Sequence, residues 1–210
     1  RVRTGETWCE TFAVIGYPSE VSPGWLSPLF AYPGPVDVAL HVEPVRNDEA
    51  ARHLRRQLAR FESTRRIEAK RERLEDPQTE MAAKDAAELS RALARGDGRL
   101  FRVGLYVTVR APSEEALERE AHRVRSLCAS LLLDVRPVTF RSLQGWVTTL
   151  PLGIDALRLR RRAARRPGRR GGLRVEAPGV GEVRGQRGEA EHGGEQGRLA
   201  GGATPAYGAG

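Results

Sequence analysis

Basic and aromatic side chains share one face of a predicted strand, and this face is the clearest candidate for a binding site. In LFRVGLYVTVR (residues 100–110), Arg102, Tyr106 and Arg110 are spaced four residues apart, and alternate residues of a strand share a face. His41 lies on the corresponding face of another alternating segment, VDVALHVE. Arginines interleaved with an aromatic ring on an exposed sheet can contact the phosphates and bases of single-stranded nucleic acid. The alternatives are a solvated face, or one covered by another domain.

Catalytic motifs are not found in the sequence. A phosphate-binding GxxxxGK[ST] loop is absent, because neither of the two lysines, Lys70 and Lys84, follows a glycine. The four histidines have no metal-binding spacing, and a solvated or partner-facing His41 is more expected than a catalytic base. Cys9 and Cys128 are far apart, which fits a reducing compartment better than a disulfide scaffold. We therefore expect no catalytic residue, no cofactor and no metal in this chain.

The elements that would position the candidate face alternate between strands and helices. Strand patterns cover residues 8–17, 36–43, 100–110 and about 133–135. Helical patterns begin near Trp25, at Asn47 or Asp48, at Pro77 and after Ser113, and the first half of TFRSLQGWVTTLPLG (residues 139–153) is also expected to be helical. This order predicts an α+β fold, namely a two-layer domain with a mainly antiparallel sheet of ferredoxin-like character and helices.

The long predicted helix that begins near Asn47 is rich in arginine, which raises a second possible binding surface. Its basic residues are interrupted by glutamates such as Glu62, Glu68 and Glu72. Opposite charges at helical spacing are typical of a solvated helix with ion pairs along its surface. The pattern therefore favours a solvated helix over a binding surface.

The net charge of +8 is distributed unevenly along the chain. Residues 1–157 contain 23 basic and 22 acidic residues, whereas residues 158–210 contain 12 arginines and 5 glutamates. The second segment is rich in Arg, Gly and Ala and has few large apolar residues, so it is predicted to be a disordered tail. The domain boundary is therefore placed at residue 157, and the argument for a nucleic-acid partner from overall charge concerns the basic tail alone.

Several motifs together resemble one protein family. They are GYPSEVSPGWLSPL (16–29), VDVALHVEP (36–44), DPQTEMAAKDAAEL (76–89), RLFRVGLYVTV (99–109) and SLQGWVTTLPLGID (142–155). In this order they resemble the N-terminal region of TraC/TrbE-like conjugation ATPases, the motor proteins of type IV secretion systems in GC-rich bacteria.

The resemblance implies a docking role rather than catalysis. Members of the family hydrolyse ATP, with Mg, in a RecA-like domain that follows the matched region, and no residue here matches its nucleotide-binding motifs. The N-terminal region docks onto inner-membrane secretion subunits and packs against the motor. The resemblance therefore implies a cytoplasmic domain peripheral to the inner-membrane complex. Trp25 and Trp146 are candidate interface residues, although either could simply be core. No apolar run is long enough to span a bilayer.

The segment after LPLGIDALRLRR departs from the family pattern. The chain begins at Arg1 without a hydrophobic leader, so a fragment or a processed chain is expected. Out-of-frame translation of GC-rich DNA yields Arg, Gly, Ala and Pro, so a frameshift after about Arg160 is the favoured hypothesis. The competing hypothesis is a genuine tail that binds nucleic acid electrostatically through RRPGRRGGLR, with an affinity that falls steeply with salt.

Overall fold

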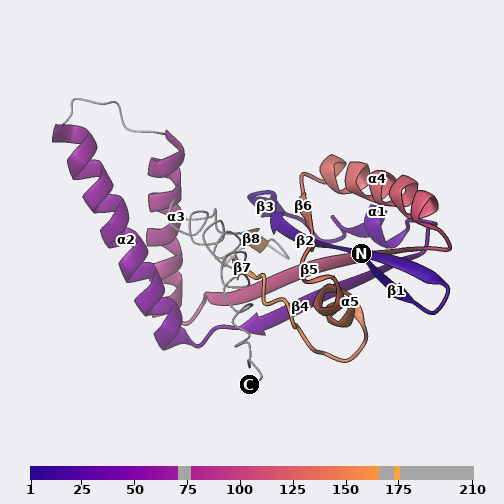
Figure 1. Ribbon diagram of the computed structural model, residues 1–210. Coiled ribbons are helices and arrows are strands. Elements are labelled where there is room, and N and C mark those ends of the chain that lie inside the picture. Colours follow the sequence, from indigo (N-terminus) through magenta and orange to yellow (C-terminus); the bar gives the residue numbers. More distant parts are fainter. Residues whose placement is uncertain (71–76, 166–172, 176–210) are drawn as a thin grey trace, which may run out of the picture. The chain divides into compact units, whose positions relative to one another are not determined.

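The computed structural model describes residues 1–70, 77–165 and 173–175. The helices are α1 (Ser27–Phe30), α2 (Asn47–Lys70), α3 (Pro77–Ala94), α4 (Glu114–Ser130) and α5 (Ser142–Thr149) (Figure 1). The strands are β1 (Val2–Thr4), β2 (Thr7–Gly16), β3 (Glu20–Val21), β4 (Val36–Pro44), β5 (Arg99–Ala111), β6 (Asp134–Pro137), β7 (Arg161–Arg165) and β8 (Leu173–Val175). The predicted α+β class is confirmed.

Four strands and two helices form a ferredoxin-like unit. The order β2, α1, β4, β5, α4, β6 along the chain is the split βαβ pattern. In the sheet the strands lie in the order β4, β5, β2, β6, and every neighbouring pair is antiparallel. The predicted ferredoxin-like character is therefore present in the topology, with α2 and α3 in the place of the loop that would join β4 to β5.

The core lies between this sheet and helices α1 and α4, which cover the same face of it (Figure 1). Helix α4 begins where the Ser113 hydroxyl accepts a hydrogen bond from the Ala116 N–H at 3.2 Å. Its apolar stripe packs on the odd-numbered apolar residues of β5 and includes the fully buried Cys128. Burial raises the pKa of the Cys128 thiol to about 11. This side chain is thus a core residue, as its helical spacing indicates.

Strand β4 lies at an edge of the sheet, and its apolar face is only partly covered. Val36 and Val38 pack against the core, but Leu40 is 50% exposed and Val42 is 53% exposed. The alternating sequence predicts all four on one face. It does not show that the contacts of the core end halfway along the strand.

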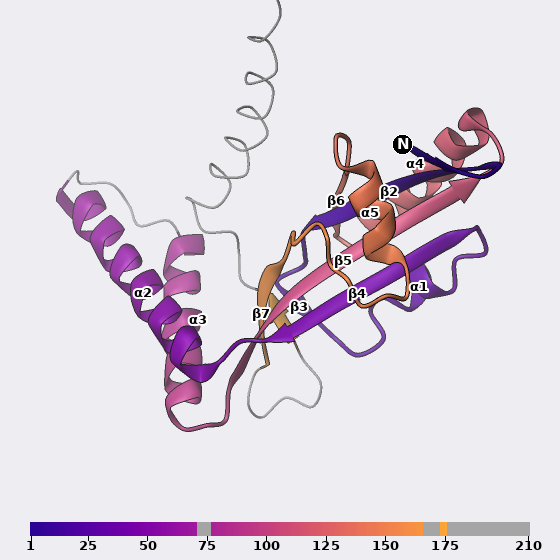
Figure 2. The same cartoon turned by 60° about the horizontal axis from the view of Figure 1, so that its bottom comes forward.

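Helices α2 and α3 pack against each other and join the sheet at the ends of β4 and β5 (Figure 2). Their shared core contains Leu54, Leu93 and Leu100, and the Val45 N–H donates to the Leu100 carbonyl at 2.8 Å. Gly96 follows the pair with φ of +81°, which favours glycine at a helix end. The predicted helix starts, at Asn47 or Asp48 and at Pro77, agree with the observed bounds of α2 and α3.

The sheet continues past the predicted domain boundary at residue 157. Strand β7 pairs with the first half of β5, β8 pairs with β7, and Ala163 and Ala164 are buried. Placing the start of a disordered tail at Arg158 was therefore wrong, because small alanines fit beside β5 without an alternating apolar pattern. The rest of the predicted tail, residues 166–172 and 176–210, lies outside the described residues. Within the described chain, no helix is long and apolar enough to cross a membrane.

Candidate functional site around helix α5

Helix α5 lies against the face of the sheet opposite to α1 and α4, on a row of threonine side chains. Thr108 of β5 lies 2.7 Å from the hydroxyl of Thr11 and 2.8 Å from that of Thr149, oxygen to oxygen. Gly145 permits the close approach, because a Cβ at this position would lie 2.9 Å from the Thr11 Cβ. The helix is thus fixed to the sheet by buried hydrogen bonds rather than by an apolar layer.

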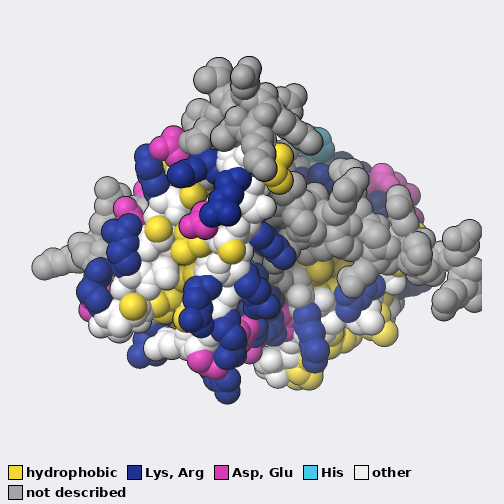
Figure 3. Space-filling model, turned by 90° about the vertical axis from the view of Figure 1, so that its left-hand side faces the viewer, with side chains coloured by type: hydrophobic (Ala, Val, Ile, Leu, Met, Phe, Trp, Pro, Cys, Tyr) yellow, Lys and Arg dark blue, Asp and Glu magenta, His cyan; other side chains and the backbone are white. Residues whose placement is uncertain are grey.

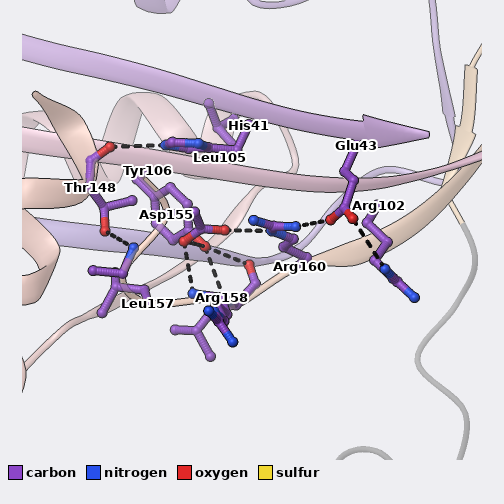
Figure 4. Close-up of polar contacts among 12 residues, drawn as sticks. His41, Glu43, Arg102, Leu105, Tyr106, Thr148, Asp155, Leu157, Arg158 and Arg160 are labelled. Atoms are coloured by element: carbon purple, nitrogen blue, oxygen red, sulfur yellow. Dashed lines mark hydrogen bonds and ion pairs between the residues drawn. The ribbon is translucent and has the colours of Figure 1, made fainter. Parts of the chain in front are cut away.

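The segment that follows α5 is held by the carboxylate of Asp155, which is buried (Figure 4). The Tyr106 hydroxyl donates to it at 3.0 Å, the Arg158 N–H at 2.8 Å and the Arg160 guanidinium at 2.5 Å. The Tyr106 hydroxyl in turn accepts from the Leu159 N–H at 3.0 Å. Strand β5 therefore binds the chain on both sides of Leu157, just before β7 begins.

The electrostatics of this cluster favour an ionised carboxylate at Asp155. Burial alone would raise the pKa of Asp155, but the hydrogen bonds from Arg160, Arg158 and Tyr106 outweigh it, and the net shift is downward. For Tyr106 the pKa is raised, first by burial and then by the neighbouring Asp155 carboxylate. The pair is therefore a neutral phenol that donates to a charged carboxylate.

Charge pairs extend the cluster towards the helix pair. Arg160 also pairs with Glu43 on β4, and Glu43 lies 3.5 Å from Arg102 on β5. Arg102 pairs in addition with Glu49 in the first turn of α2. On the other side of Tyr106, the His41 Nε2–H donates to the Thr148 carbonyl of α5 at 2.9 Å. The cluster thus connects β4, β5, α2 and the segment after α5, and Figure 4 shows its contacts between β4, β5 and that segment.

These contacts overturn the predicted nucleic-acid face. Tyr106 is fully buried and cannot stack on a base, because α5 and the segment after it cover this side of the sheet. Arg102 is paired with Glu43 and Glu49, and Arg110 lies 3.0 Å from the Asp37 carboxylate. His41 contacts α5. An open face is therefore wrong, and the face is covered by α5 and the segment after it rather than by another domain.

The α5 region carries four exposed large apolar side chains. Phe140 is fully exposed, and Leu143, Leu152 and Ile154 are each between 51 and 60% exposed. The segments before and after the helix are joined, since the Arg141 guanidinium donates to the carbonyls of Ala156 and Leu157. Four large apolar side chains within fifteen residues therefore lie on one fixed structural unit, which we call the α5 surface: Phe140, Leu143, Leu152 and Ile154.

The two predicted interface tryptophans are both half-buried. Trp25 packs against the main core. Trp146, on α5, lines a cavity of about 250 Å³ together with Thr4, Asp37 and Arg110. Neither burial state shows what the residue binds, and an interface role for either tryptophan stays a prediction.

The sequence analysis named Arg102, Tyr106 and His41 of the cluster but missed Asp155 and Arg160, and it found none of the α5 surface. The sequence offers one sign of the role of Asp155, because this acid directly follows the apolar run LPLGI. The leucines of the α5 surface gave none, since an apolar residue is expected in a core. In the described residues, no group of three or more His, Cys, Asp or Glu side chains could hold a metal ion.

Comparison with known families agrees with the motif resemblance. The family model described as TraC protein matches residues 20–154, which is more than half of the chain. The matched region includes β4, the helix pair, β5, α4 and α5. No curated protein matches the chain at a significant level. Because the family match covers more than half of the chain, the chain belongs to the TraC family of type IV secretion and conjugation proteins.

Proposed function

We propose that this chain is a non-catalytic docking and assembly domain of a conjugation ATPase, and that the α5 surface is its docking site. The family match supports a role in type IV secretion. The observation that carries the proposal is the exposure of Phe140, Leu143, Leu152 and Ile154 on one fixed unit. In this proposal the motor domain of the family, which the matched region would precede, covers this surface, and inner-membrane subunits are further partners.

The energetics of the α5 surface favour a protein partner. Burying a large apolar side chain completely stabilises by about 1.5 to 3 kcal/mol, so completing the burial of these four contributes several kcal/mol. Interfaces commonly combine an apolar centre with a polar rim, and Arg141 and Gln144 supply polar groups beside this centre. Because buried hydrogen bonds already fix α5, little ordering is needed on binding.

The proposed domain lies at the cytoplasmic side of the inner-membrane complex and does not itself hydrolyse ATP. The sequence supports the lack of ATP hydrolysis, because it has no GxxxxGK[ST] loop. Measurable ATP turnover by the purified chain, in a preparation that contains no contaminating motor domain, would contradict the non-catalytic assignment.

The test is binding of the full chain to a separately purified motor domain of the same family. A Phe140→Ser, Leu143→Ser variant is expected to bind at least tenfold more weakly, because it removes the centre of the α5 surface. The matched control is Leu40→Ser, Val42→Ser on β4, whose side chains are similarly exposed. Equal binding by both variants and the unchanged chain would contradict the proposal. Circular dichroism melting checks that each variant is folded.

A further inference from the structure

The outward face of α2 carries arginines that have no partner in the part of the chain that the structure describes. Arg55, Arg56, Arg60 and Arg66 are exposed, and none forms a hydrogen bond or ion pair within the described residues. The sequence pattern predicted a helix neutralised by ion pairs along its surface. Over the described part of α2, such pairing is observed at Arg52, which lies 3.0 Å from Asp48.

These four arginines lie on one side of the helix. At 3.6 residues per turn they fall within an arc of about 140°, opposite to the stripe that packs on α3. That stripe includes Leu54, Leu58 and Phe61. Figure 3 faces this side of the molecule and shows Lys and Arg side chains around hydrophobic ones. Beyond its acidic first turn, this side of α2 is therefore rich in arginines that have no partner among the described residues.

Two exposed apolar side chains accompany the arginines at the end of the helix pair remote from the sheet. Ile67 near the end of α2 is 49% exposed, and Met81 near the start of α3 is 62% exposed. Around the helix, Ile67 falls within about 20° of both Arg56 and Arg60. The end of the helix pair remote from the sheet thus combines positive charge with two partly exposed apolar side chains, Ile67 on the arginine side of α2 and Met81 on the neighbouring helix α3.

We propose that this surface, defined by Arg55, Arg56, Arg60, Arg66, Ile67 and Met81, binds an anionic lipid bilayer. Arginines on an amphipathic helix are attracted to acidic headgroups, and apolar side chains beside them enter the boundary with the acyl chains. A nucleic acid would also attract the arginines, but it would leave Ile67 and Met81 without an apolar environment. The combination therefore favours lipid.

This surface is separate from the α5 surface and does not depend on the docking proposal. The two lie on different elements, and the ends of α2 and α3 bearing Ile67 and Met81 are those remote from the sheet (Figures 1 and 2). A domain held by a partner through α5 could present α2 to the membrane at the same time. Vesicle binding can therefore fail while motor binding succeeds, and the reverse.

The first experiment measures partitioning of the full chain onto vesicles of phosphatidylcholine with and without phosphatidylglycerol. An Arg56→Gln, Arg60→Gln variant is expected to partition about 30-fold more weakly onto the anionic vesicles, at about fivefold for each arginine. The control, Arg99→Gln, Arg119→Gln, removes the same charge from β5 and α4 and keeps the basic C-terminal segment. An equal loss in both variants would overturn the proposal, because it would show an effect of net charge alone.

The second experiment locates the contact. Cys9 and Cys128 are buried, so a Met81→Cys variant can be labelled selectively with an environment-sensitive fluorophore. Its emission should shift to the blue on anionic vesicles, while the same label on a Ser130→Cys variant, at the exposed end of α4, should not shift. No shift at position 81 would overturn the proposal. So would loss of duplex-DNA binding in the α2 variant while vesicle binding is retained.

Discussion

The two faces of strand β5 are both buried, but by different chemistry. On one face, Leu105, Val107 and Val109 pack under α1 and α4 in an apolar core. On the other, Tyr106 and Thr108 are fully buried beneath α5 and the segment after it, held by hydrogen bonds. The stability of the apolar face depends on how well its side chains fill the core, and that of the polar face depends on every buried polar group having a hydrogen-bond partner. The two faces should therefore respond to different substitutions.

The largest effect is expected on the apolar face. Leu105→Ala should lower the free energy of unfolding by about 4 kcal/mol, because Leu105 is fully buried and the substitution leaves a cavity. Its cross-strand neighbour Leu40 is half exposed and provides the control. Chemical denaturation of both variants makes the comparison, and similar losses for Leu40→Ala and Leu105→Ala would show that this face is not the core.

A slightly smaller loss is expected on the polar face. Asp155→Ala should cost about 3 kcal/mol, because it leaves Arg160 and the Tyr106 hydroxyl without their buried partner. A double-mutant cycle with Arg160→Ala measures the pair, and we expect the two losses to be strongly non-additive. Additive losses would mean that the two side chains do not interact in solution.

Gly145→Ala tests the approach of α5 to the sheet. Alanine in a helix interior is ordinarily stabilising by up to about 1 kcal/mol relative to glycine, but here the new Cβ would lie 2.9 Å from the Thr11 Cβ. We expect a loss of about 2 kcal/mol from overpacking. Gln144→Ala, at the exposed neighbouring position, is the control. A thermal melt in which Gly145→Ala is stabilised would disprove the close packing of α5.

The smallest effect concerns pH. The pKa of Asp155 in the folded protein lies below its value in the unfolded chain, so its charge stabilises the fold above about pH 4, and this contribution is lost as the pH falls through the folded pKa. The difference in stability between the unchanged chain and Asp155→Asn should therefore shrink on acidification below about pH 4. Equilibrium denaturation at several pH values measures it, and a constant difference would exclude this linkage.

The comparison also explains how far the sequence could predict the fold. Alternation in β5 correctly separates Leu105 and Val107 from Tyr106 and Thr108, and helical spacing correctly identifies the buried stripe of α4. Alternation reports which residues share a face, but it does not report what covers that face. The burial of Tyr106 depends on contacts with Asp155 and Leu159, about fifty residues away, which no local pattern encodes.

Amino-acid composition failed to predict strand β7 for a related reason. The run RRAAR in β7 has no apolar alternation and resembles the low-complexity sequence that follows it. Its place in the sheet comes from pairing with β5 and from the small volume of Ala163 and Ala164, which are both buried. The Arg161 guanidinium also donates to the Ile15 carbonyl at 3.0 Å. Backbone pairing and side-chain reach are not visible in composition.

The position of the helix pair between β4 and β5 has a consequence for how this domain can diversify. The hydrogen bond from Val45 to Leu100 closes the ladder of these strands at the base of the pair. Whole turns could be added to α2 and α3, or removed from them, without changing the register of any strand. The length of the helix pair can therefore differ between related domains while the sheet stays the same.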